Sequence, residues 1–487
     1  MTEVTLAVVL PLLGAFVLPL TRHTGVRWLA AVIGPALLAA CALLLFAAWS
    51  AFDAPYTIAL GGFAPPLGIA FYIDRLALLF ALAVPLATLA LWPAEAGADE
   101  SVGRRQSLTL LLAGALSGLA LSGDLFNMYV FYELAAVASY GLIVGNGNSP
   151  AYVAAFRYLM ISALGSVVGL IGIALIYFKT GTLNLAHLST LSEQLADPQG
   201  LAAFAMLVIG FGVKAEIFPV NGWVPEVYSA AGKRVAALLA GLASKLAVLV
   251  IVRVLLLVFP YDETRQLLLV LGIFGVAVGE LAAWQARDLP RMLAWSSIGQ
   301  LGVVFVAFSL PGTAGVIAGV TVAMHHLVVK SALFLLADRW DKAITRLRGA
   351  ASTSHLGAAL FVLFSLSLLG LPPLPGFWSK FLVLGGLAAS ASPLQLLAMG
   401  VILTGTVIEG AYLLRVIVML YAGPDTATPV PRQRRGNLLS ASLFALVLLA
   451  AAVLVDPLWQ GIEALADRAV DTTGYQNTVL NTPEAGR

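Results

Sequence analysis

The sequence predicts an all-α integral membrane protein with about 14 transmembrane helices, and two observations lead to this class. Of the 487 residues, 60% are hydrophobic, only 11% are charged, and the mean hydropathy is +0.95. The exterior of a soluble domain needs more charge than that. The apolar residues also form continuous runs of the length needed to cross a bilayer as a helix, about 20 residues. Because the runs are continuous, they exclude the alternating pattern of a membrane β-barrel.

The apolar runs occupy most of the chain in sequence order. They lie at residues 4–20, 28–50, 70–92, 106–122, 125–145, 153–178, 202–221, 235–259, 265–284, 290–310, 312–336, 356–388, 394–421 and 438–455. The first run follows Met1-Thr2-Glu3, which lacks the basic start of a signal peptide, so we expect a retained helix and not a cleaved leader. The polar connections between the runs are too short for a soluble catalytic or nucleotide-binding domain.

The composition gives no indication of a bound cofactor, metal or nucleic acid. The single cysteine, Cys41, can form neither an internal disulfide nor a zinc or iron–sulfur cluster. The sequence also has no glycine-rich phosphate loop and no paired haem ligands. We therefore expect no cofactor, no metal and no nucleic-acid partner. Any redox chemistry would belong to partner subunits.

Lysine and arginine residues are distributed unevenly between alternate loops. One set of loops holds sixteen of them, whereas the other set, with both termini, holds only Lys179, Arg265, Arg468 and Arg487. Positively charged loops remain in the cytoplasm, so we expect the richer set to be cytoplasmic and both termini to lie outside. The bias also favours an even number of helices. We expect a multi-pass protein of a bacterial or archaeal plasma (inner) membrane.

Charged residues also stand within the apolar runs, where each costs about 2.5–3.5 kcal/mol at the membrane centre. The basic ones are Arg75, Lys214, Lys245, Arg253, Lys330, Lys380 and Arg415, and the acidic ones are Asp74, Asp124, Glu133, Glu216, Glu280 and Glu409. Asp74, Arg75 and Asp124 lie near run ends, where snorkelling to the surface explains them as well as a functional role does.

The deeper charges predict a polar pathway for protons. They are Glu133, Lys214, Lys245, Lys330 and Lys380. His326 and Lys330 are spaced i, i+4 and share one helix face, whereas His325 points elsewhere and is expected to make a helix contact. A proton relay needs groups that hold and release a proton easily, as histidine and desolvated lysine do.

Two of the runs are interrupted by prolines and a glycine beside a lysine. The stretch GFGVKAEIFPVNGWVPEVY, residues 210–228, contains Lys214, and LGLPPLPGFWSKFLVLGG, residues 369–386, contains Lys380. Each stretch predicts a broken helix with an ionisable group at the break. Paired broken helices are typical of membrane proteins built from internal repeats.

The positions of the two breaks predict the domain organisation. We expect two inverted five-helix repeats, at 106–259 and 265–421, preceded by helices 1–3 in 1–105 and followed by the last helix and outer tail in 438–487. In the helix after each break, the first repeat has Lys245 and the second has Glu409. If Glu409 faces inward, it should hold the proton on the second lysine more firmly than the first lysine holds its own.

The tail after the last apolar run has a weak helical pattern. Its stretch WQGIEALADRAV is apolar at Trp459, Ile462, Leu465 and Val470, which is close to helical spacing. We expect a short surface helix that rests on the membrane or on a partner, followed by a disordered end. Deletion of the last ten residues is therefore expected to be harmless.

Six stretches between Asp74 and Arg415 carry a family resemblance. They are GDLFNMYVFYELAAVASYGLIV (123–144), FGVKAEIFPVNGWVPEVYSAA (211–231), LLAGLASKLAVLVIVR (238–253), DLPRMLAWSSIGQLG (288–302), HHLVVKSALF (325–334) and GLPPLPGFWSKFL (370–382). Together they resemble the proton-conducting transporter family. That family includes the antiporter-like membrane subunits of respiratory complex I, the D subunit of Mrp-type sodium/proton antiporters, and membrane subunits of related hydrogenase complexes. The first stretch is most similar to the Mrp branch.

The resemblance implies fourteen helices, two inverted five-helix repeats and a hydrophilic axis at mid-membrane. It also implies a site made of the residues that burial selects. These are Glu133 as the key glutamate, Lys214 as the pumping lysine of the first broken helix, Lys245 as the central lysine, His326 and Lys330 as the connecting histidine and lysine, and Lys380 as the lysine of the second broken helix.

The chain departs from the family pattern at three places. Asn221 stands where the family usually has a histidine after the proline, and Val322 stands where a first histidine often precedes His326. These two changes remove titratable groups from the proton-entry route. The stretch Gly232-Lys233-Arg234 replaces a Pro-Ser-Pro-like entry to the next helix, and we expect it to add two positive charges at the cytoplasmic mouth.

These features predict an ion-translocating membrane subunit of a multi-subunit complex related to Mrp antiporters, complex I or membrane-bound hydrogenases. Its ion is the proton, with sodium/proton antiport as a variant, and its partners are the bilayer and other membrane subunits. Association and separation of Glu133 and Lys214 would gate proton release. Two alternatives remain open. One is a structural or coupling subunit with an inactive relay, and the other is a stand-alone secondary transporter of an organic solute.

Overall fold

The computed structural model describes residues 2–21, 27–93, 100–145, 147–340, 343–390, 392–423 and 433–481. Each of the apolar runs contains a helix in this part of the chain. Ten of the described helices are long and apolar enough to cross a membrane, and three shorter apolar helices lie at Arg75–Ala90, Pro198–Gly212 and His355–Leu369. The prediction of a mostly helical, multi-pass membrane protein is confirmed.

One small antiparallel sheet departs from the all-α prediction. It pairs β1 (Tyr56–Ala59) with β2 (Ala70–Ile73). The run at 70–92 therefore begins as a strand, and helix α3 (Arg75–Ala90) starts only after Asp74, whose carboxylate accepts a hydrogen bond from the Ala77 backbone N–H at 2.7 Å. That N-cap satisfies one of the unpaired donors of the first helical turn.

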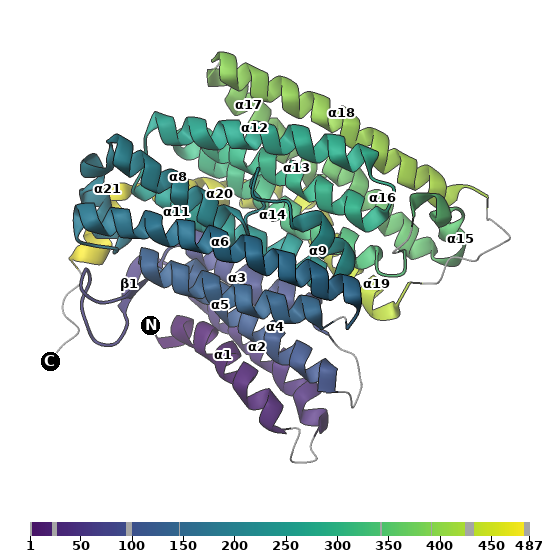
Figure 1. The fold of residues 1–487 in the computed structure, drawn as a ribbon, viewed down its shortest axis with the longest axis horizontal. Coiled ribbons are helices and arrows are strands. Elements are labelled where there is room, and N and C mark those ends of the chain that lie inside the picture. Colours follow the sequence, from purple (N-terminus) through teal and green to yellow (C-terminus); the bar gives the residue numbers. More distant parts are fainter. Residues whose placement is uncertain are drawn as a thin grey trace. The chain divides into compact units, whose positions relative to one another are not determined.

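The chain divides into two compact units, of which the first is formed by Met1–Ala215, Leu246–Thr264 and Leu465–Arg487. Its helices are α1 (Thr2–Thr21), α2 (Arg27–Ser50), α3, α4 (Glu100–Leu121), α5 (Leu125–Val144), α6 (Ser149–Thr180), α7 (Leu185–Thr190), α8 (Pro198–Gly212), most of α11 (Ser244–Leu257) and α21 (Thr472–Leu480). Within the unit, α1 packs against α2 and α4, and α6 packs along α8 (Figure 1).

Helices α6 and α8 approach each other through glycines. A Cβ atom on Gly210 would lie 2.6 Å from the Cα atom of Gly169, a separation that no side chain tolerates. The close contact brings the end of α8, just before the first break, against α6. Helix α6 also carries Ser162, whose hydroxyl accepts a hydrogen bond from the Lys214 ammonium group.

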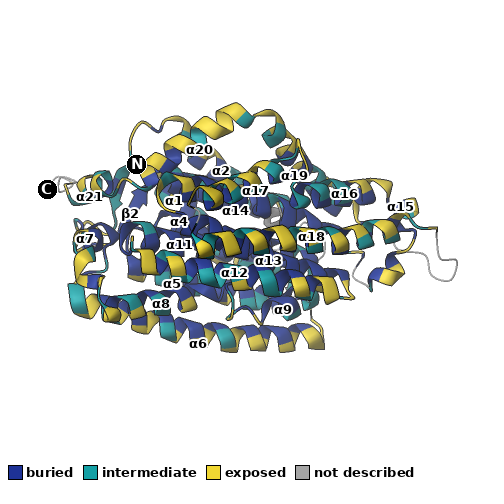
Figure 2. Ribbon diagram, turned by 90° about the horizontal axis from the view of Figure 1, so that it is seen from above, coloured by how far each residue is buried: buried dark blue, intermediate teal, exposed yellow. Residues whose placement is uncertain are grey.

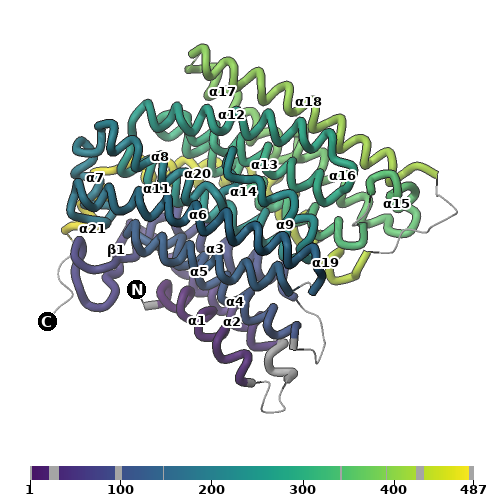
Figure 3. Tube along the Cα trace, viewed as in Figure 1, coloured from purple at the N-terminus to yellow at the C-terminus, as the bar shows by residue number. Residues whose placement is uncertain are grey.

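The second unit is formed by Glu216–Lys245 and Arg265–Ala464. Its helices are α9 (Val224–Ala230), α10 (Lys233–Leu238), most of α12 (Asp262–Gln285), α13 (Leu289–Ser309), α14 (Gly312–Leu336), α15 (Ala350–Thr353), α16 (His355–Leu369), α17 (Pro375–Ser390), α18 (Pro393–Tyr421), α19 (Arg435–Val453) and most of α20 (Val455–Ala469). The trace in Figure 3 shows α17 running beside α18, with which it is in contact.

Burial separates the helices inside the second unit from those at its edge. In the most apolar stretch of α13, 94% of the residues are buried. In the corresponding stretch of α18, only 33% are buried. Figure 2 shows this difference as exposed stripes along α18. The outer helices therefore offer an apolar face to lipid or to partner subunits, while α13 and α14 are surrounded by protein.

Both predicted helix breaks occur. Helix α8 ends at Gly212 and α9 begins at Val224, and α16 ends at Leu369 before α17 begins at Pro375. Gly370 has a φ of 82°, in the left-handed region where glycine carries no steric penalty. A further irregularity, a π-helical turn at Leu239–Ala243, separates α10 from α11.

The tail is more ordered than the sequence predicts. After the predicted surface helix, α20, the chain forms α21 in the region expected to be disordered. The Tyr475 ring packs edge-on against Tyr72 with centroids 4.3 Å apart, and Val479 is buried. The prediction of a disordered end is therefore wrong for 472–480.

Candidate functional site

The first buried lysine, Lys214, lies at the break after α8 and has a carboxylate, an aromatic face and a hydroxyl around its ammonium group. Its Nζ atom is 3.8 Å from Glu133 Oε1, 3.3 Å from Ser162 Oγ and 3.2 Å from the centroid of the Tyr132 ring. The ring face attracts a cation, most strongly where water is excluded. Three weak partners therefore stabilise this charge.

Tyr132 also fixes the backbone around that lysine. Its hydroxyl donates to the Gly210 carbonyl at 2.6 Å and accepts from the Lys214 backbone N–H at 3.4 Å. The pair with Glu133 has a different character, because 3.8 Å is too long for a hydrogen bond. Glu133 is also the more accessible partner, with a side-chain exposure of 34% against 5% for Lys214. The geometry is that of a long ion pair with one partly exposed partner.

Glu216 occupies an unusual backbone conformation within the first break. Its φ is 58°, and among the residues that the structure describes no other non-glycine residue has a positive φ. The side chain is buried, and its Oε1 atom accepts a hydrogen bond from the Tyr228 hydroxyl at 2.6 Å. Asn221 donates its Nδ2–H to the Glu216 backbone carbonyl at 3.2 Å. Asn221 thus stabilises the break.

Lys245 follows the π-helical turn and is fully buried. Its ammonium group donates to the Ala240 carbonyl and, at 3.1 Å, to Ser244 Oγ. The turn makes this possible by presenting a backbone carbonyl to a side chain one turn later. π-helical turns of this kind are frequent at functional sites.

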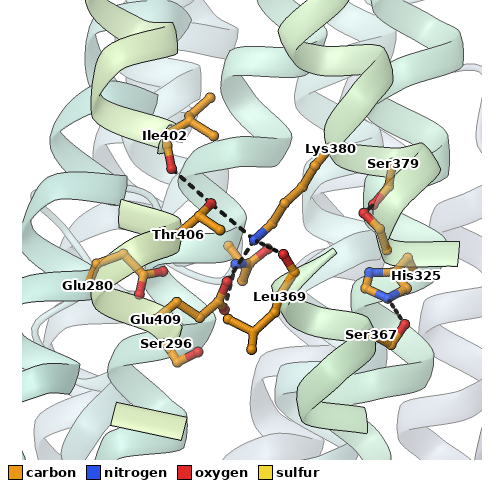
Figure 4. A network of polar contacts seen from close by, with 12 residues as sticks. Glu280, Ser296, His325, Ser367, Leu369, Ser379, Lys380, Ile402, Thr406 and Glu409 are labelled. Carbon is orange, nitrogen blue, oxygen red and sulfur yellow. Dashed lines mark hydrogen bonds and ion pairs between the residues drawn. The ribbon is translucent and has the colours of Figure 1, made fainter. Parts of the chain in front are cut away.

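Helix α14 contributes Lys330, His326 and His325. Lys330 Nζ donates to Ser296 Oγ at 2.6 Å and lies 3.4 Å from the Leu293 carbonyl, both on α13. His326 is buried on the same helix face, and neither of its ring nitrogens has a hydrogen-bond partner in the described part of the chain. His326 and Lys330 both lie in α14, so their i, i+4 spacing places them on one face of this helix. His325 makes the expected helix contact, since its Nε2 lies 2.8 Å from Ser367 Oγ on α16 (Figure 4).

The second break positions Lys380 against Glu409. Lys380 Nζ is 2.8 Å from Glu409 Oε2, 3.2 Å from Thr406 Oγ1 and 3.5 Å from the Leu369 carbonyl, which lies at the end of α16 (Figure 4). The other oxygen of Glu409 accepts from Gln300 Nε2 at 2.8 Å. Glu409 therefore faces inward and is in direct contact with the lysine, which is the condition that the sequence-based argument requires.

A second buried acid, Glu280 on α12, lies in the same region of the unit (Figure 4). Its Oε2 accepts from the Tyr412 hydroxyl at 2.9 Å. Two glycines make room for its side chain: a Cβ on Gly299 would lie 2.3 Å from Glu280 Oε1, and one on Gly405 would lie 3.3 Å from its Cγ. A side chain at Gly299 would meet the carboxylate directly and require it to move, whereas one at Gly405 would make only a tight contact.

The sequence alone identifies the charged members of this site but not their neutral partners. Glu216, Glu280 and Glu409 stand out as intramembrane acids, which is a usable signal. The partners Ser162, Ser296, Gln300, Thr406 and Tyr412 look like ordinary residues of apolar helices. Only the packing of the helices brings them to the charges.

Two of the charges near run ends are explained by structure. Asp74 is buried and forms an ion pair with Arg253 at 2.5 Å, in addition to capping α3. Asp124 accepts from the Asn127 backbone N–H at 2.9 Å and caps α5. Snorkelling does not describe a side chain as buried as that of Asp74.

Lys233, one of the two charges expected at the cytoplasmic mouth, is a buried side chain in the structure. Its ammonium group donates to the Ser229 carbonyl at 2.7 Å and the Tyr228 carbonyl at 3.3 Å. Both carbonyls belong to the last turn of α9. The residue closes the C-terminal end of this helix, where the helix dipole favours a cation.

Comparisons with known proteins identify a family and several relatives of this chain. The family described as "NADH:quinone oxidoreductase/Mrp antiporter, TM" matches residues 122–407. The chain is 33% identical over 426 residues to NADH-quinone oxidoreductase subunit N of Desulforudis audaxviator (strain MP104C), which covers 82% of this chain and 84% of the relative. It is 30% identical over 447 residues to the D subunit of the Na(+)/H(+) antiporter of Bacillus subtilis (strain 168), covering 87% and 88%.

A solved structure of an archaeal respiratory membrane complex, the membrane-bound sulfane sulfur reductase, contains a chain of similar fold. The TM-score is 0.89 at 28% identity, and the match covers 98% of this chain and 100% of the other. The likeness therefore extends beyond the family-matched residues 122–407 to nearly the full length of the chain.

Proposed function

The chain belongs to the NADH:quinone oxidoreductase/Mrp antiporter family, and from this premise we propose that it translocates protons as one membrane subunit of a larger complex. Sodium/proton antiport is the variant suggested by the Bacillus relative, which is named as part of a Na(+)/H(+) antiporter. The proposal covers the ion pathway only and assigns no redox chemistry to this chain.

The observation that carries the proposal is the loose pair of Lys214 and Glu133. Their charged atoms are 3.8 Å apart, and only weak partners, the Tyr132 ring and the Ser162 hydroxyl, support the ammonium group. Close contact and additional hydrogen bonds are what stabilise a buried ion pair against the cost of removing its charges from water. A pair that must open and close in each cycle needs the looser geometry found here.

The second unit supplies further proton carriers. Lys245 and Lys330 each have hydroxyl and carbonyl partners, and His326 has two ring nitrogens that can exchange a proton. Lys380 has a carboxylate, Glu409, in direct contact. We propose that Glu133 and Lys214 gate proton release, and that Lys245, His326, Lys330 and Lys380 pass protons among themselves.

The finer architecture is part of the same proposal. It has fourteen membrane helices, two inverted repeats at 106–259 and 265–421, helices 1–3 in 1–105 and the last helix with the tail in 438–487. Both termini lie outside, with the arginine- and lysine-rich loops in the cytoplasm. The two breaks, each beside a lysine, support the repeats, and the charge bias supports the orientation.

Variants of Lys214 test the proposal in the assembled complex reconstituted into vesicles. Lys214→Ala and Lys214→Met should abolish ion-coupled proton transport while the subunit still inserts and assembles. Lys179→Ala is the matched control. Lys179 lies in the last turn of α6 and forms an ion pair with Asp197, which precedes α8. Transport close to wild type in both Lys214 variants would instead indicate a structural subunit with an inactive relay. Solute transport by the isolated chain would indicate a secondary transporter.

A further inference from the structure

Glu216 is held in a conformation that its residue type does not favour. A positive φ of 58° brings the Cβ atom close to the backbone, and glycine or asparagine adopts it more readily than glutamate. The backbone carbonyl of Glu216 is fixed by Asn221, and its Oε1 by Tyr228. Strained residues of this kind persist where the surroundings impose them, and they cluster at functional sites.

The carboxylate of Glu216 interacts electrostatically with two buried lysines. Lys245 and Lys330 are the basic groups that act on it electrostatically, and the Ser244 hydroxyl also lies beside it. In the opposite direction, Glu216 is the acid that acts on Lys245. The hydrogen-bond partners of Lys245 itself, Ala240 and Ser244, carry no charge. Glu216 is therefore the counter-charge of the central lysine.

One oxygen of Glu216 is still available. Its Oε2 atom is buried and has no hydrogen-bond partner among the described residues, whereas Oε1 is satisfied by Tyr228. A side chain kept only to shape the break would not need a second, unsatisfied oxygen, because glycine fits the backbone without burying a charge. An acid that exchanges a proton does need a free oxygen to receive it.

We propose that Glu216 is a proton-exchanging residue and the partner of Lys245, a role that rests on the proposed function. In the step, an N–H bond of the Lys245 ammonium breaks and an O–H bond forms on Glu216, so that an ion pair becomes a neutral amine and a neutral acid. The Ser244 hydroxyl can carry the proton by accepting one and donating another. Tyr228 is a positioning residue, because its hydroxyl holds the carboxyl group through Oε1.

Glu216→Gln tests this proposal in the reconstituted complex. The amide keeps an acceptor for Tyr228 but cannot exchange a proton, so we expect proton transport to fall by about tenfold or more with normal assembly. Glu226→Gln, on α9 of the same unit, is the matched control and should transport as wild type does. Glu216→Gly relieves the strained φ and serves as the second variant should the glutamine form assemble poorly. It should be equally inactive and at least as thermally stable.

Infrared difference spectroscopy gives a readout that a purely structural role would not change. A carboxyl stretching band that appears and disappears with pH should be present in wild type and Glu226→Gln and absent in Glu216→Gln. The proposal is overturned if Glu216→Gln transports within about twofold of wild type, or if the spectra of the two proteins are the same. Loss of transport in Lys214→Ala with full transport in Glu216→Gln would reject only the role of Glu216. Full transport in both would reject the proposed function.

Discussion

The ammonium nitrogen of Lys380 lies 2.8 Å from the carboxylate of Glu409. The two residues come from consecutive helices, α17 and α18, and Glu409 is fully buried. The sequence-based comparison of the two breaks requires Glu409 to face inward beside Lys380, and the structure meets this condition. Gln300 and Thr406 complete the hydrogen bonds of the pair.

Replacement of Glu409 by glutamine should shift the pH dependence of transport. Two unit charges about 4 Å apart interact by roughly 4 kcal/mol at an effective dielectric constant near 20. Without the carboxylate, the Lys380 ammonium group keeps only neutral partners, the Thr406 hydroxyl and the Leu369 carbonyl. We expect the alkaline limb of the transport profile to move to lower pH, because this buried cation loses its neutralising charge.

Glu409→Asp is the control for that experiment, because it keeps the negative charge on a shorter side chain. Its profile should stay closer to that of wild type. An unchanged profile in Glu409→Gln would show that the contact between the two residues has no part in transport.

The lysine at the first break has a carboxylate partner as well, but a more distant one. Lys214 is 3.8 Å from Glu133, compared with 2.8 Å for the pair at the second break. The sequence predicts that the two break lysines differ because the helix after the first break carries Lys245, whereas the helix after the second break carries an acid, Glu409. The structure gives a difference of distance, and at the first break an aromatic ring occupies the position closest to the ammonium group.

Variants of Tyr132 separate its ring from its hydroxyl. Tyr132→Phe keeps the face that lies 3.2 Å from Lys214 Nζ and loses only the hydroxyl, with its bond to Gly210. Tyr132→Leu also loses the cation–π contact, which contributes about 2 kcal/mol where water is excluded. We therefore expect transport rates to fall in the order wild type, phenylalanine, leucine. Equal rates in the two variants would exclude a role for the ring.

The membrane helices could be predicted from the sequence because a bilayer demands one feature, a long apolar run, that is local. The β1–β2 pair is not predicted, since residues 70–73 are as apolar as the helix that follows and read as part of the same run, although their partner strand lies only ten residues earlier. Helix α21 is also not predicted, because its stability depends on tertiary packing. Its sequence, TTGYQNTVL, is weakly helical, and burial of Tyr475 stabilises it.

The site shows the same division between local and distant information. Each lysine is conspicuous as a charge in an apolar run, and the prolines beside Lys214 and Lys380 indicate the breaks. The strained backbone of Glu216 and the burial of Lys233 have no such signal. Both depend on which carbonyls and hydroxyls the folded chain places around them.

The ion pair of Asp74 and Arg253 should contribute to stability and not to transport. Arg253→Met leaves the Asp74 charge buried without its partner, and breaking a buried pair in this way costs about 3–5 kcal/mol. The double variant with Asp74→Asn removes both charges while an amide oxygen can still cap α3. We expect thermal unfolding in detergent to show a large loss for the single variant and partial recovery for the double. Equal losses would argue against the pair.

Tyr475 should be required for the tail to dock. The residue is buried, it packs edge-on against Tyr72, and burial raises the pKa of its phenol well above the ordinary value, so the group stays neutral. Tyr475→Ala should lower the free energy of unfolding by about 3 kcal/mol, seen as a lower thermal midpoint. Tyr421→Ala, at an exposed position, is the control. Deletion of the last ten residues, which removes the buried Val479, should also destabilise the protein, contrary to the sequence-based expectation.

Lys233 should act as a helix cap whose loss affects stability alone. Its ammonium group satisfies carbonyls in the last turn of α9, including that of Ser229 at 2.7 Å. Methionine has a similar length and packs in the same space but donates no hydrogen bond, so those carbonyls would be left buried without a partner. That change costs about 1–3 kcal/mol. We expect Lys233→Met to lower the thermal midpoint, with unchanged transport per folded complex and unchanged dependence on sodium. Arg234→Met, one residue later and less buried, should have the smaller effect. If Lys233→Met instead leaves stability intact and alters the ion dependence, the residue serves the ion path and the capping role is wrong.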